Sequence, residues 1–318
     1  MLRKICTYFN SIVFKDYVFP IFACIKLNAM KRLFFLILFL CLAVNVFAQS
    51  DSLAFVHGPW LSERVDGLVM RQCQFEQGSL FASNQHIMVW ELSDTDDFAL
   101  QLAYRPERTK TSDMAKEQHA VAAVNGSFFD MGRHFPVLFL RIDGEDLGQT
   151  TQEETKLQSE NYRFGTLAVT HDSVYILKTD TVSQWEEGLP YPNMMTARPL
   201  LIYEGETLPL QENLGFVNDR HNRTAVGIRA DGTVLLIVVD GRAPKAAGMS
   251  LKELQQVMWW LGCRDALNLD GGGSATFYAD LRGNHGVLNY PSDNGRFDHE
   301  GERTVSNAVL VVRKAKKR

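Results

Sequence analysis

Short apolar runs of strand length, separated by turn-forming residues, recur along the chain from Leu68 onward. Their content of Val, Ile, Leu and aromatic residues is typical of β-strands. The runs lie at Leu68–Gln74, His86–Glu91, Phe98–Tyr104, Ala120–Val124, Val137–Ile142, Phe164–Thr170, Ser173–Leu177, Pro199–Tyr203, Thr224–Arg229, Thr233–Val239, Ala266–Leu269, Ala275–Tyr278 and Thr304–Val312. Because each strand has to bury its apolar face against another layer, this pattern predicts packed sheets. We expect an α+β (mixed α/β) fold, with large mixed β-sheets and few helices in a single domain.

One helix is clearly signalled between two of these runs. Ser250 and Glu253 have the spacing of a capping box. One apolar face follows at helical spacing, made by Leu251, Leu254, Val257, Met258 and Leu261. A strand–helix–strand unit therefore spans residues 239–270, and a crossover of this kind sets its two strands parallel. Asp240 and Asp270 are then expected at corresponding carboxyl ends of the sheet.

Residues 30–48 have the features of a secretory signal peptide. Met30-Lys31-Arg32 supplies a positive start, an apolar stretch follows, and Val46-Phe47-Ala48 forms a small-residue cleavage site. The apolar stretch is shorter than the roughly 20 residues that a membrane span needs. The simplest account of residues 1–29 is that translation starts at Met30; a signal anchor beginning at Val13 is the alternative. We expect an exported protein, periplasmic or secreted, whose mature chain begins at Gln49 and has no membrane span.

Charge and cysteine content narrow the functional class. A formal net charge of −4 and a pI near 6.1 give no electrostatic reason to expect nucleic-acid binding. Only Cys73 and Cys263 follow the signal segment, so the chain is not a disulfide scaffold, and whether these two are bridged stays open. No His and Cys spacing typical of a zinc site is present in the sequence.

Three motifs place polar residues and glycines directly after strand-like runs. They are Ala123-Val124-Asn125-Gly126-Ser127-Phe128-Phe129-Asp130, Val239-Asp240-Gly241-Arg242 and Asn268-Leu269-Asp270-Gly271-Gly272-Gly273-Ser274. Glycine lets backbone N–H groups approach a ligand closely, whereas Asn-Gly and Asp-Gly also occur in ordinary tight turns. Three such strand ends in one chain favour a single polar site assembled from distant segments.

In this order, together with further segments, the motifs resemble the phosphodiester glycosidase domain family. The further segments are Ala197-Arg198-Pro199-Leu200-Leu201, Arg223-Thr224-Ala225-Val226-Gly227 and Glu302-Arg303-Thr304-Val305-Ser306-Asn307-Ala308. The resemblance covers roughly residues 85–313 and implies hydrolysis of a sugar-1-phosphodiester. Together with the signal segment, this resemblance predicts three parts of the chain. They are an upstream extension and signal peptide (1–48), an N-terminal leader with the first strand (49–84) and a phosphodiester glycosidase-like catalytic domain (85–318).

The chemistry of that reaction selects candidate residues. Asp270 and Asp240 are the leading carboxylates for attack at the anomeric carbon, with Asp130, Asp298 and Glu302 in reserve. The residues expected to bind phosphate or sugar are Asn125, Gly126, Arg223, Arg242, Asn268, Gly271, Gly272, Gly273, Ser274 and Arg303. Guanidinium groups can bind two phosphate oxygens at once, and the three successive glycines could form an anion nest beside Asp270. Phe128 and Phe129 are expected in the core more than as a sugar platform.

The sequence leaves cofactor and substrate open. No cofactor is required, although oxygen ligands such as Asp240 and Asp270 are compatible with calcium or magnesium. The expected partner is a glycan or sugar-phosphodiester substrate. Two alternatives remain: a hydrolase of cell-wall or capsule polymers with sugar-phosphate linkages, and a non-catalytic domain that binds sugar phosphates.

Overall fold

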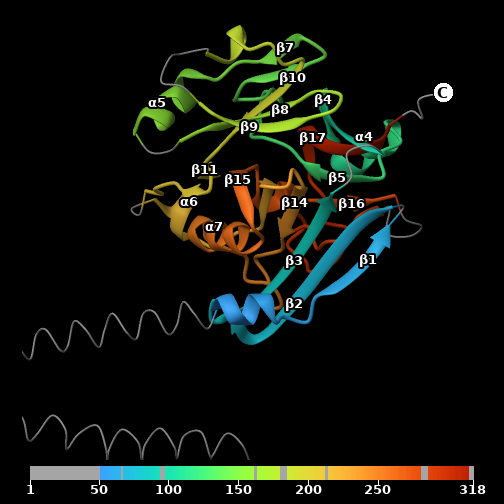
Figure 1. Cartoon of the computed structure of the whole chain (residues 1–318), viewed down its shortest axis with the longest axis vertical. Coiled ribbons are helices and arrows are strands. Elements are labelled where there is room, and N and C mark those ends of the chain that lie inside the picture. The colour runs from blue at the N-terminus through green and yellow to red at the C-terminus, as the bar shows by residue number, and fades with distance from the viewer. Residues whose placement is uncertain are drawn as a thin grey trace, which may run out of the picture. The chain divides into compact units, whose positions relative to one another are not determined.

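The computed structural model shows stacked β-sheets with few helices (Figure 1). It describes residues 51–65, 67–93, 97–160, 163–179, 185–211, 214–280 and 286–314. The signal peptide, the Met30 start and the mature terminus at Gln49 all lie outside the described residues. From Leu53 to Arg318 the chain forms one compact unit.

The largest sheet has eight strands. In spatial order they are β1 (Leu61–Val65), β2 (Leu68–Leu80), β3 (Ser83–Leu92), β14 (Val234–Val239), β13 (Arg223–Arg229), β15 (Cys263–Asn268), β11 (Leu200–Tyr203) and β12 (Glu206–Thr207). The segment expected to be a leader with the first strand therefore contributes β1 and β2 to this sheet.

Two smaller sheets lie beside it. The five-stranded sheet has the order β7 (Glu145–Gly148), β6 (Leu140–Ile142), β10 (Asn193–Ala197), β8 (Gly165–Val169) and β9 (Val174–Lys178). The four-stranded sheet has the order β16 (Phe277–Ala279), β5 (Ala122–Asn125), β17 (Thr304–Arg313) and β4 (Phe98–Lys110). The strand runs expected from the sequence are thus distributed over three sheets.

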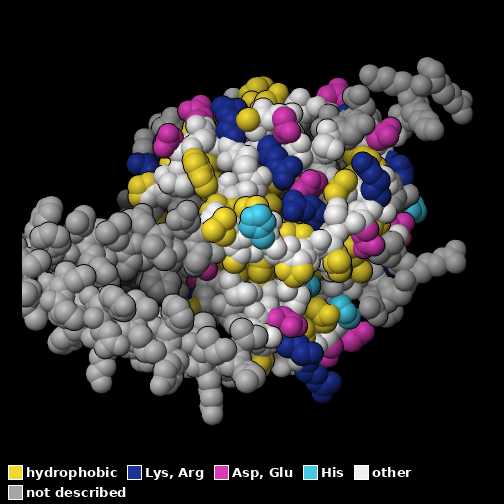
Figure 2. All heavy atoms as spheres, turned by 60° about the horizontal axis from the view of Figure 1, so that its bottom comes forward, with side chains coloured by type: hydrophobic (Ala, Val, Ile, Leu, Met, Phe, Trp, Pro, Cys, Tyr) yellow, Lys and Arg dark blue, Asp and Glu magenta, His cyan; other side chains and the backbone are white. Residues whose placement is uncertain are grey.

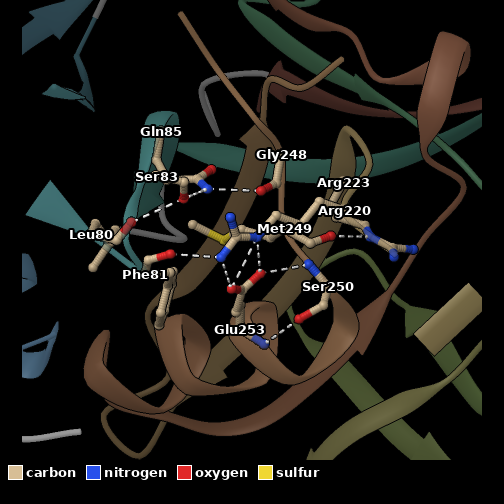
Figure 3. Close-up of polar contacts among 10 residues, drawn as sticks. All are labelled: Leu80, Phe81, Ser83, Gln85, Arg220, Arg223, Gly248, Met249, Ser250 and Glu253. Atoms are coloured by element: carbon tan, nitrogen blue, oxygen red, sulfur yellow. Dashed lines mark hydrogen bonds and ion pairs between the residues drawn. The ribbon is translucent and has the colours of Figure 1, made fainter. Parts of the chain in front are cut away.

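Helices are short and few among the described residues. Residues 51–56 are helical, and the labelled helices are α4 (Thr111–Glu117), α5 (Gln152–Glu160), α6 (Gly215–Asn218) and α7 (Leu251–Trp260), with 3-10 turns η2 (Trp185–Gly188) and η3 (Gly272–Ser274). The capping box that begins α7 is confirmed: the Glu253 backbone N–H donates to Ser250 Oγ at 3.2 Å, and the Ser250 N–H donates to Glu253 Oε2 at 2.9 Å (Figure 3). The chain is therefore mostly β-structure, as the sequence predicted.

The expectation of mixed sheets is wrong, because every strand pair described in the structure is antiparallel. β14 and β15 do run in the same direction, as expected for the strand–helix–strand unit. They are not neighbours, since β13 lies between them and pairs antiparallel with both. β14 pairs with β13 on one edge and with β3 on the other, so β15, which follows the crossover through α7, pairs with the free edge of β13.

The central strands of the eight-stranded sheet, such as β3 and β14, are buried on both faces. Met88 and Trp90 point into one core, whereas Ile87 and Val89 point into the other, where α7 packs. The Trp90 ring stacks on Phe277 of the four-stranded sheet, with centroids 5.0 Å apart and an interplanar angle of 3°. Strands buried on both faces have near-continuous apolar sequences, which is why these runs were easy to recognise.

The bridge that the sequence left open is absent. Cys73 and Cys263 are both buried free thiols, and burial raises the pKa of each to about 12. No helix in the described part of the chain is long and apolar enough to span a bilayer. On the face shown in Figure 2, basic and acidic side chains are interspersed, as the small net charge suggests.

Candidate active site

Three strand ends of the large sheet meet at one edge. β14 and β15 end there, and the antiparallel strand β13 between them begins there, just after Asn222. Gly241 and Gly271 approach Asn222 closely: a Cβ at Gly241 would lie 2.6 Å from its backbone N, and one at Gly271 would lie 2.5 Å from its carbonyl O. The glycines after Asp240 and Asp270 therefore leave room for the backbone of the middle strand.

The end of β5 joins this edge from the four-stranded sheet. The Asn125 side-chain amide donates to the carbonyl of Asp270 at 2.7 Å, and the Asp270 N–H donates to the carbonyl of Gly126 at 3.0 Å. Asn125 Oδ1 accepts from the Thr224 hydroxyl at 2.7 Å. Asn125 is fully buried, so it fixes the Asp270 loop to two sheets.

Asp270 has the most perturbed carboxylate of the site. Burial raises the pKa of Asp270 to about 6, against the opposing effects of the Ser274 hydroxyl, the Gly271 N–H at 2.9 Å and the charges of Arg303 and Arg198. A carboxyl group with a pKa near neutrality can exchange protons under physiological conditions, and such groups are concentrated in active sites. Asp270 is therefore suited to acid–base or nucleophilic chemistry.

Gly271 caps the 3-10 turn η3, which runs from Gly272 to Ser274. The N–H groups of Gly271 and Gly272 make hydrogen bonds within the protein, which the expected anion nest did not include. The Gly271 N–H donates to the Asp270 carboxylate itself, and the Gly272 N–H donates to the Asn222 carbonyl at 2.9 Å. Gly272 has φ +60°, a conformation that favours glycine. Two of the three N–H groups thus hold the turn together, which leaves anion binding chiefly to side chains.

Two arginines lie against this turn. A Cβ at Gly272 would lie 2.9 Å from Nη2 of Arg242, and one at Gly273 would lie 2.5 Å from Nη2 of Arg303. Arg303 also donates from Nε to Asp293 Oδ1 at 2.7 Å, and Arg242 is exposed. The structure therefore brings Asp270, Arg242 and Arg303 together, although they come from separate segments of the sequence.

His221 is a further titratable group beside Arg242. Its Nδ1 lies 3.5 Å from Arg242 Nη2. Burial, followed by the charges of Arg223 and Arg242, lowers the pKa of His221, although Asp219 opposes the shift. These effects favour the neutral imidazole of His221.

Arg198 is a functional candidate that the sequence reasoning did not select. Its Nε and Nη2 bind both oxygens of Glu154, at 2.5 and 2.9 Å, and its guanidinium lies 4.6 Å from the ring centre of Phe128 and 5.1 Å from that of Phe216. Its charge lowers the pKa of Asp270. Its position just before Pro199, in one of the quoted motifs, was the available signal.

Arg223 lies beside the site, but its guanidinium points to backbone carbonyls. It donates to Met249 O at 2.8 Å (Figure 3). It also donates to Asp219 O at 2.9 Å and Phe216 O at 3.0 Å, and only 2% of the residue is exposed. Arg223 therefore connects the start of β13 to α6 and to the segment before α7. The phosphate contact expected of Arg223 from the sequence stays a prediction.

Asp240 is enclosed, with 1% of the residue exposed. Its carboxylate accepts from Asn289 Nδ2 at 2.9 Å and from the Tyr290 backbone N–H at 3.0 Å, and His86 Nδ1 lies 2.7 Å from its Oδ2. Donors thus surround both oxygens. The sequence reasoning missed His86 and Asn289, which have no motif around them. Within the described residues, no group of three or more His, Cys, Asp or Glu side chains is suited to a metal ion.

Asn268, at the end of β15, and Ser274, at the end of η3, are buried on either side of Asp270 in the sequence. The Asn268 amide donates to Arg198 O at 2.7 Å and to Leu269 O at 2.8 Å, so it attaches the Arg198 segment to the end of β15. Asn268 Oδ1 and Asn222 Nδ2 are buried without a hydrogen-bond partner. Buried polar atoms are normally paired, so these two atoms are available to a ligand or a water molecule.

The three reserve carboxylates, Asp130, Asp298 and Glu302, accept hydrogen bonds from groups of the protein. Asp130 accepts from the N–H groups of Gly132 and Arg133, which lowers its pKa, and Asp298 accepts from the Asn294 amide at 2.8 Å. Glu302 accepts from the N–H and hydroxyl of Ser112 at 2.8 and 2.6 Å. The two aromatic residues expected in the core, Phe128 and Phe129, are partly buried and pack against it.

Gly271→Ala is expected to lower the free energy of unfolding. The new Cβ would meet the Asn222 carbonyl oxygen at 2.5 Å, and relief requires a backbone shift, which costs roughly 1–3 kcal/mol. Chemical denaturation should show this loss. Gly188→Ala is the matched control, because a Cβ there would have no neighbour within 4 Å. Equal stability of the two variants would contradict the close packing inferred here.

Comparison with known proteins identifies relatives of this chain. The family model described as Phosphodiester glycosidase matches residues 118–312. The chain is 28% identical over 225 residues to human N-acetylglucosamine-1-phosphodiester alpha-N-acetylglucosaminidase, covering 64% of this chain and 40% of that protein. It is 37% identical over 97 residues to the mouse enzyme of the same name, covering 30% and 18%. The chain therefore spans well under half the length of these curated relatives.

Solved structures share the fold. The catalytic domain of the zebrafish enzyme of that name, auto-inhibited by its pro-peptide, superposes with a TM-score of 0.58 at 19% identity, covering 79% of this chain and 83% of that one. A hypothetical protein from Synechocystis superposes with a TM-score of 0.57 at 15% identity, covering 80% and 64%. At these identities, the likeness concerns the fold alone.

Proposed function

This chain belongs to the phosphodiester glycosidase family, and from this premise we propose that it hydrolyses the glycosidic bond of a sugar-1-phosphodiester. The products are a free sugar and a phosphomonoester. The observation that carries the proposal is the Asp270 carboxyl group. Burial raises its pKa to about 6, whereas the nearby charges of Arg303 and Arg198 act to lower it. The name of the human relative suggests N-acetylglucosamine as the first sugar to test.

In the proposed reaction, the ionised carboxylate of Asp270 either takes a proton from the water that attacks the anomeric carbon or attacks that carbon itself. In the second case, water then hydrolyses the glycosyl ester of Asp270 and releases the sugar. The bond between that carbon and the phosphate oxygen breaks, and the electron pair leaves with the phosphate. Arg242 and Arg303 lie against the neighbouring glycine turn and neutralise the phosphate charge. Because a phosphomonoester is a good leaving group, this charge neutralisation replaces much of the acid assistance that ordinary glycosidases need.

We propose that the enclosed residues Arg223 and Asp240 position the site instead of contacting substrate. Arg223 holds three carbonyls around the start of β13. Asp240 holds Asn289, which also donates to the carbonyl of Ala275, just beyond the glycine turn. This assignment requires no metal or other cofactor. Export of the mature protein is part of the same proposal, because residues 30–48 have the features of a secretory signal peptide.

The test is hydrolysis by the purified protein of two substrates: the methyl ester of N-acetylglucosamine-1-phosphate and a nitrophenyl N-acetylglucosaminide. Release of N-acetylglucosamine from the diester, with little from the aryl glycoside, is expected. Cleavage of the aryl glycoside alone would move the protein to another glycosidase class. Binding of the diester without turnover would favour the non-catalytic alternative.

A further inference from the structure

A carboxylate lies against the glycine turn beside Arg303, and the reaction proposed above makes no use of it. A Cβ at Gly273 would lie 2.5 Å from Oδ1 of Asp293 and 2.5 Å from Nη2 of Arg303. Both side chains thus contact the third glycine after Asp270. An acid in this place competes with phosphate for the arginine, because both anions bind a guanidinium in the same way. Its presence beside a phosphate-binding group therefore requires an explanation.

The ion pair occupies one edge of the guanidinium. Oδ1 of Asp293 accepts from Nε of Arg303 at 2.7 Å and from Nη2 at 2.5 Å. A guanidinium has five N–H donors, so the edge formed by Nη1 and Nη2 can still bind a second anion. The side chain of Asp293 is 39% exposed and that of Arg303 is 24% exposed. An anion that reaches Arg303 from solvent therefore meets Asp293 as well.

The backbone around Asp293 is fixed against the same edge of the large sheet. The Ser292 hydroxyl donates to Oδ1 of Asn222, just before β13, at 3.0 Å. The Asp293 N–H donates to the carbonyl of Gly301 at 3.2 Å. Gly301 packs so closely that a Cβ there would lie 2.1 Å from the carbonyl oxygen of Pro291. Asp293 is thus held at the glycine turn by the structure around it.

The charges at the turn are suited to a singly charged phosphate. Arg242 and Arg303 contribute two positive charges, and Asp293 offsets one of them. A phosphodiester carries one negative charge, whereas a phosphomonoester carries about −1.5 to −2 at pH 7. Asp293 repels the additional charge of the monoester. Repulsion of the wrong ligand is a common source of specificity.

The proposed reaction itself changes this charge. The diester arrives with one negative charge, and cleavage leaves the electron pair of the broken bond on the phosphate. After the solution equilibrates near pH 7, the phosphomonoester product carries close to one more negative charge than the substrate did. The repulsion from Asp293 therefore rises when the bond has been broken. It favours release of the product from Arg303.

We propose that Asp293 is a specificity-determining residue, which admits singly charged phosphodiesters and disfavours phosphomonoesters. It acts against sugar-1-phosphates as substrates and against the phosphomonoester product as an inhibitor. The inference rests on the proposed function and adds to it the residue that distinguishes substrate from product by charge. Asp293 takes no part in breaking the bond.

The experiment compares two substrates of the purified full chain: N-acetylglucosamine-1-phosphate and its methyl ester. They share the sugar and the bond that breaks, and they differ in charge. The wild type is expected to have the higher kcat/KM for the methyl ester. Asp293→Asn keeps the shape and removes the charge, so it should raise kcat/KM for the monoester about fivefold relative to the methyl ester, as expected for partly exposed charges. The inhibition constant of methyl phosphate should fall by a similar factor.

Two further variants separate charge from structure. Asp293→Glu keeps the negative charge and should retain the wild-type preference. Glu300→Gln is the matched control, because it removes an exposed negative charge from the same segment of the chain. It should leave the ratio of the two kcat/KM values unchanged. An equal ratio in wild type and folded Asp293→Asn, with the methyl ester still hydrolysed, would overturn the inference and leave the proposed function standing.

If the wild type hydrolyses neither compound, the proposed function fails, and calorimetric titration with the same two compounds decides the role of Asp293. In Asp293→Asn, binding of the monoester that tightens about fivefold relative to the methyl ester would support charge selection. An equal change for both compounds, or no binding of either, would reject it.

Discussion

Asp270→Asn is expected to reduce hydrolysis of the diester at least about hundredfold, the usual effect of losing an acid–base carboxylate. Asparagine keeps the shape of the side chain but cannot become a base or a nucleophile. The variant should remain folded, since the Asn125 and Gly126 hydrogen bonds to residue 270 involve backbone atoms. Asp143→Asn is the matched control, because Asp143 is an exposed turn residue with φ +50°, which asparagine tolerates. Full activity in folded Asp270→Asn would reject the assignment.

The pH dependence provides a second readout of the same variant. Because the pKa of Asp270 is raised to about 6, the carboxylate forms only above that pH, and kcat/KM should rise through about pH 6 to a plateau. The folded pKa exceeds the unfolded value of about 3.9, so between these values the native state holds a proton that the unfolded state has lost. This group therefore lowers the free energy of unfolding as pH rises from about 4 to 6. Asp270→Asn should remove that dependence and be at least as stable as wild type at pH 7.

If kcat/KM falls above pH 6 instead, the protonated form of Asp270 is the active one, and Asp270 acts as a general acid. Thermal unfolding of wild type and variant at pH 5 and pH 7 checks the sign of the stability effect. A variant that is markedly less stable than wild type at pH 7 would contradict the view that the buried charge is a cost.

Asp240→Ala is expected to destabilise the protein by roughly 3 kcal/mol or more. The substitution removes the acceptor for the Asn289 amide and the Tyr290 N–H, and it leaves His86 without its partner, all in a buried place. Breaking one side of a buried polar network leaves the other groups desolvated and unpaired. Urea denaturation measures the loss, and Asp280→Ala, at an exposed position, is the control.

The same variant separates two views of Asp240. Loss of stability, with residual activity that tracks the folded fraction, supports a positioning role. Wild-type stability with hydrolysis abolished would instead restore Asp240 as the second catalytic carboxylate, the role first predicted from its motif.

Much of the fold follows from local patterns. The run Thr233–Val239 became β14, and the capping box at Ser250 begins α7 where the sequence placed it. Such features depend on neighbouring residues, so a single sequence is enough to recognise them. Strand pairing was less accessible: the sequence predicted that β14 and β15 run in the same direction, but not that β13 lies between them and pairs with both. Pairing depends on contacts between distant segments, which periodicity does not encode.

The candidate site, too, was predictable from the sequence only in part. The sequence alone determined which strand ends carry glycines and carboxylates, and it selected Asp270, Arg242 and Arg303, which do lie around one turn. Only the tertiary structure decided what each side chain is free to do. Burial and long-range hydrogen bonds enclose Arg223 and Asp240 and place the unselected Arg198 near Asp270. The physical reason is that charge, pKa and accessibility depend on solvent exclusion and partners, which exist only once the sheets have packed.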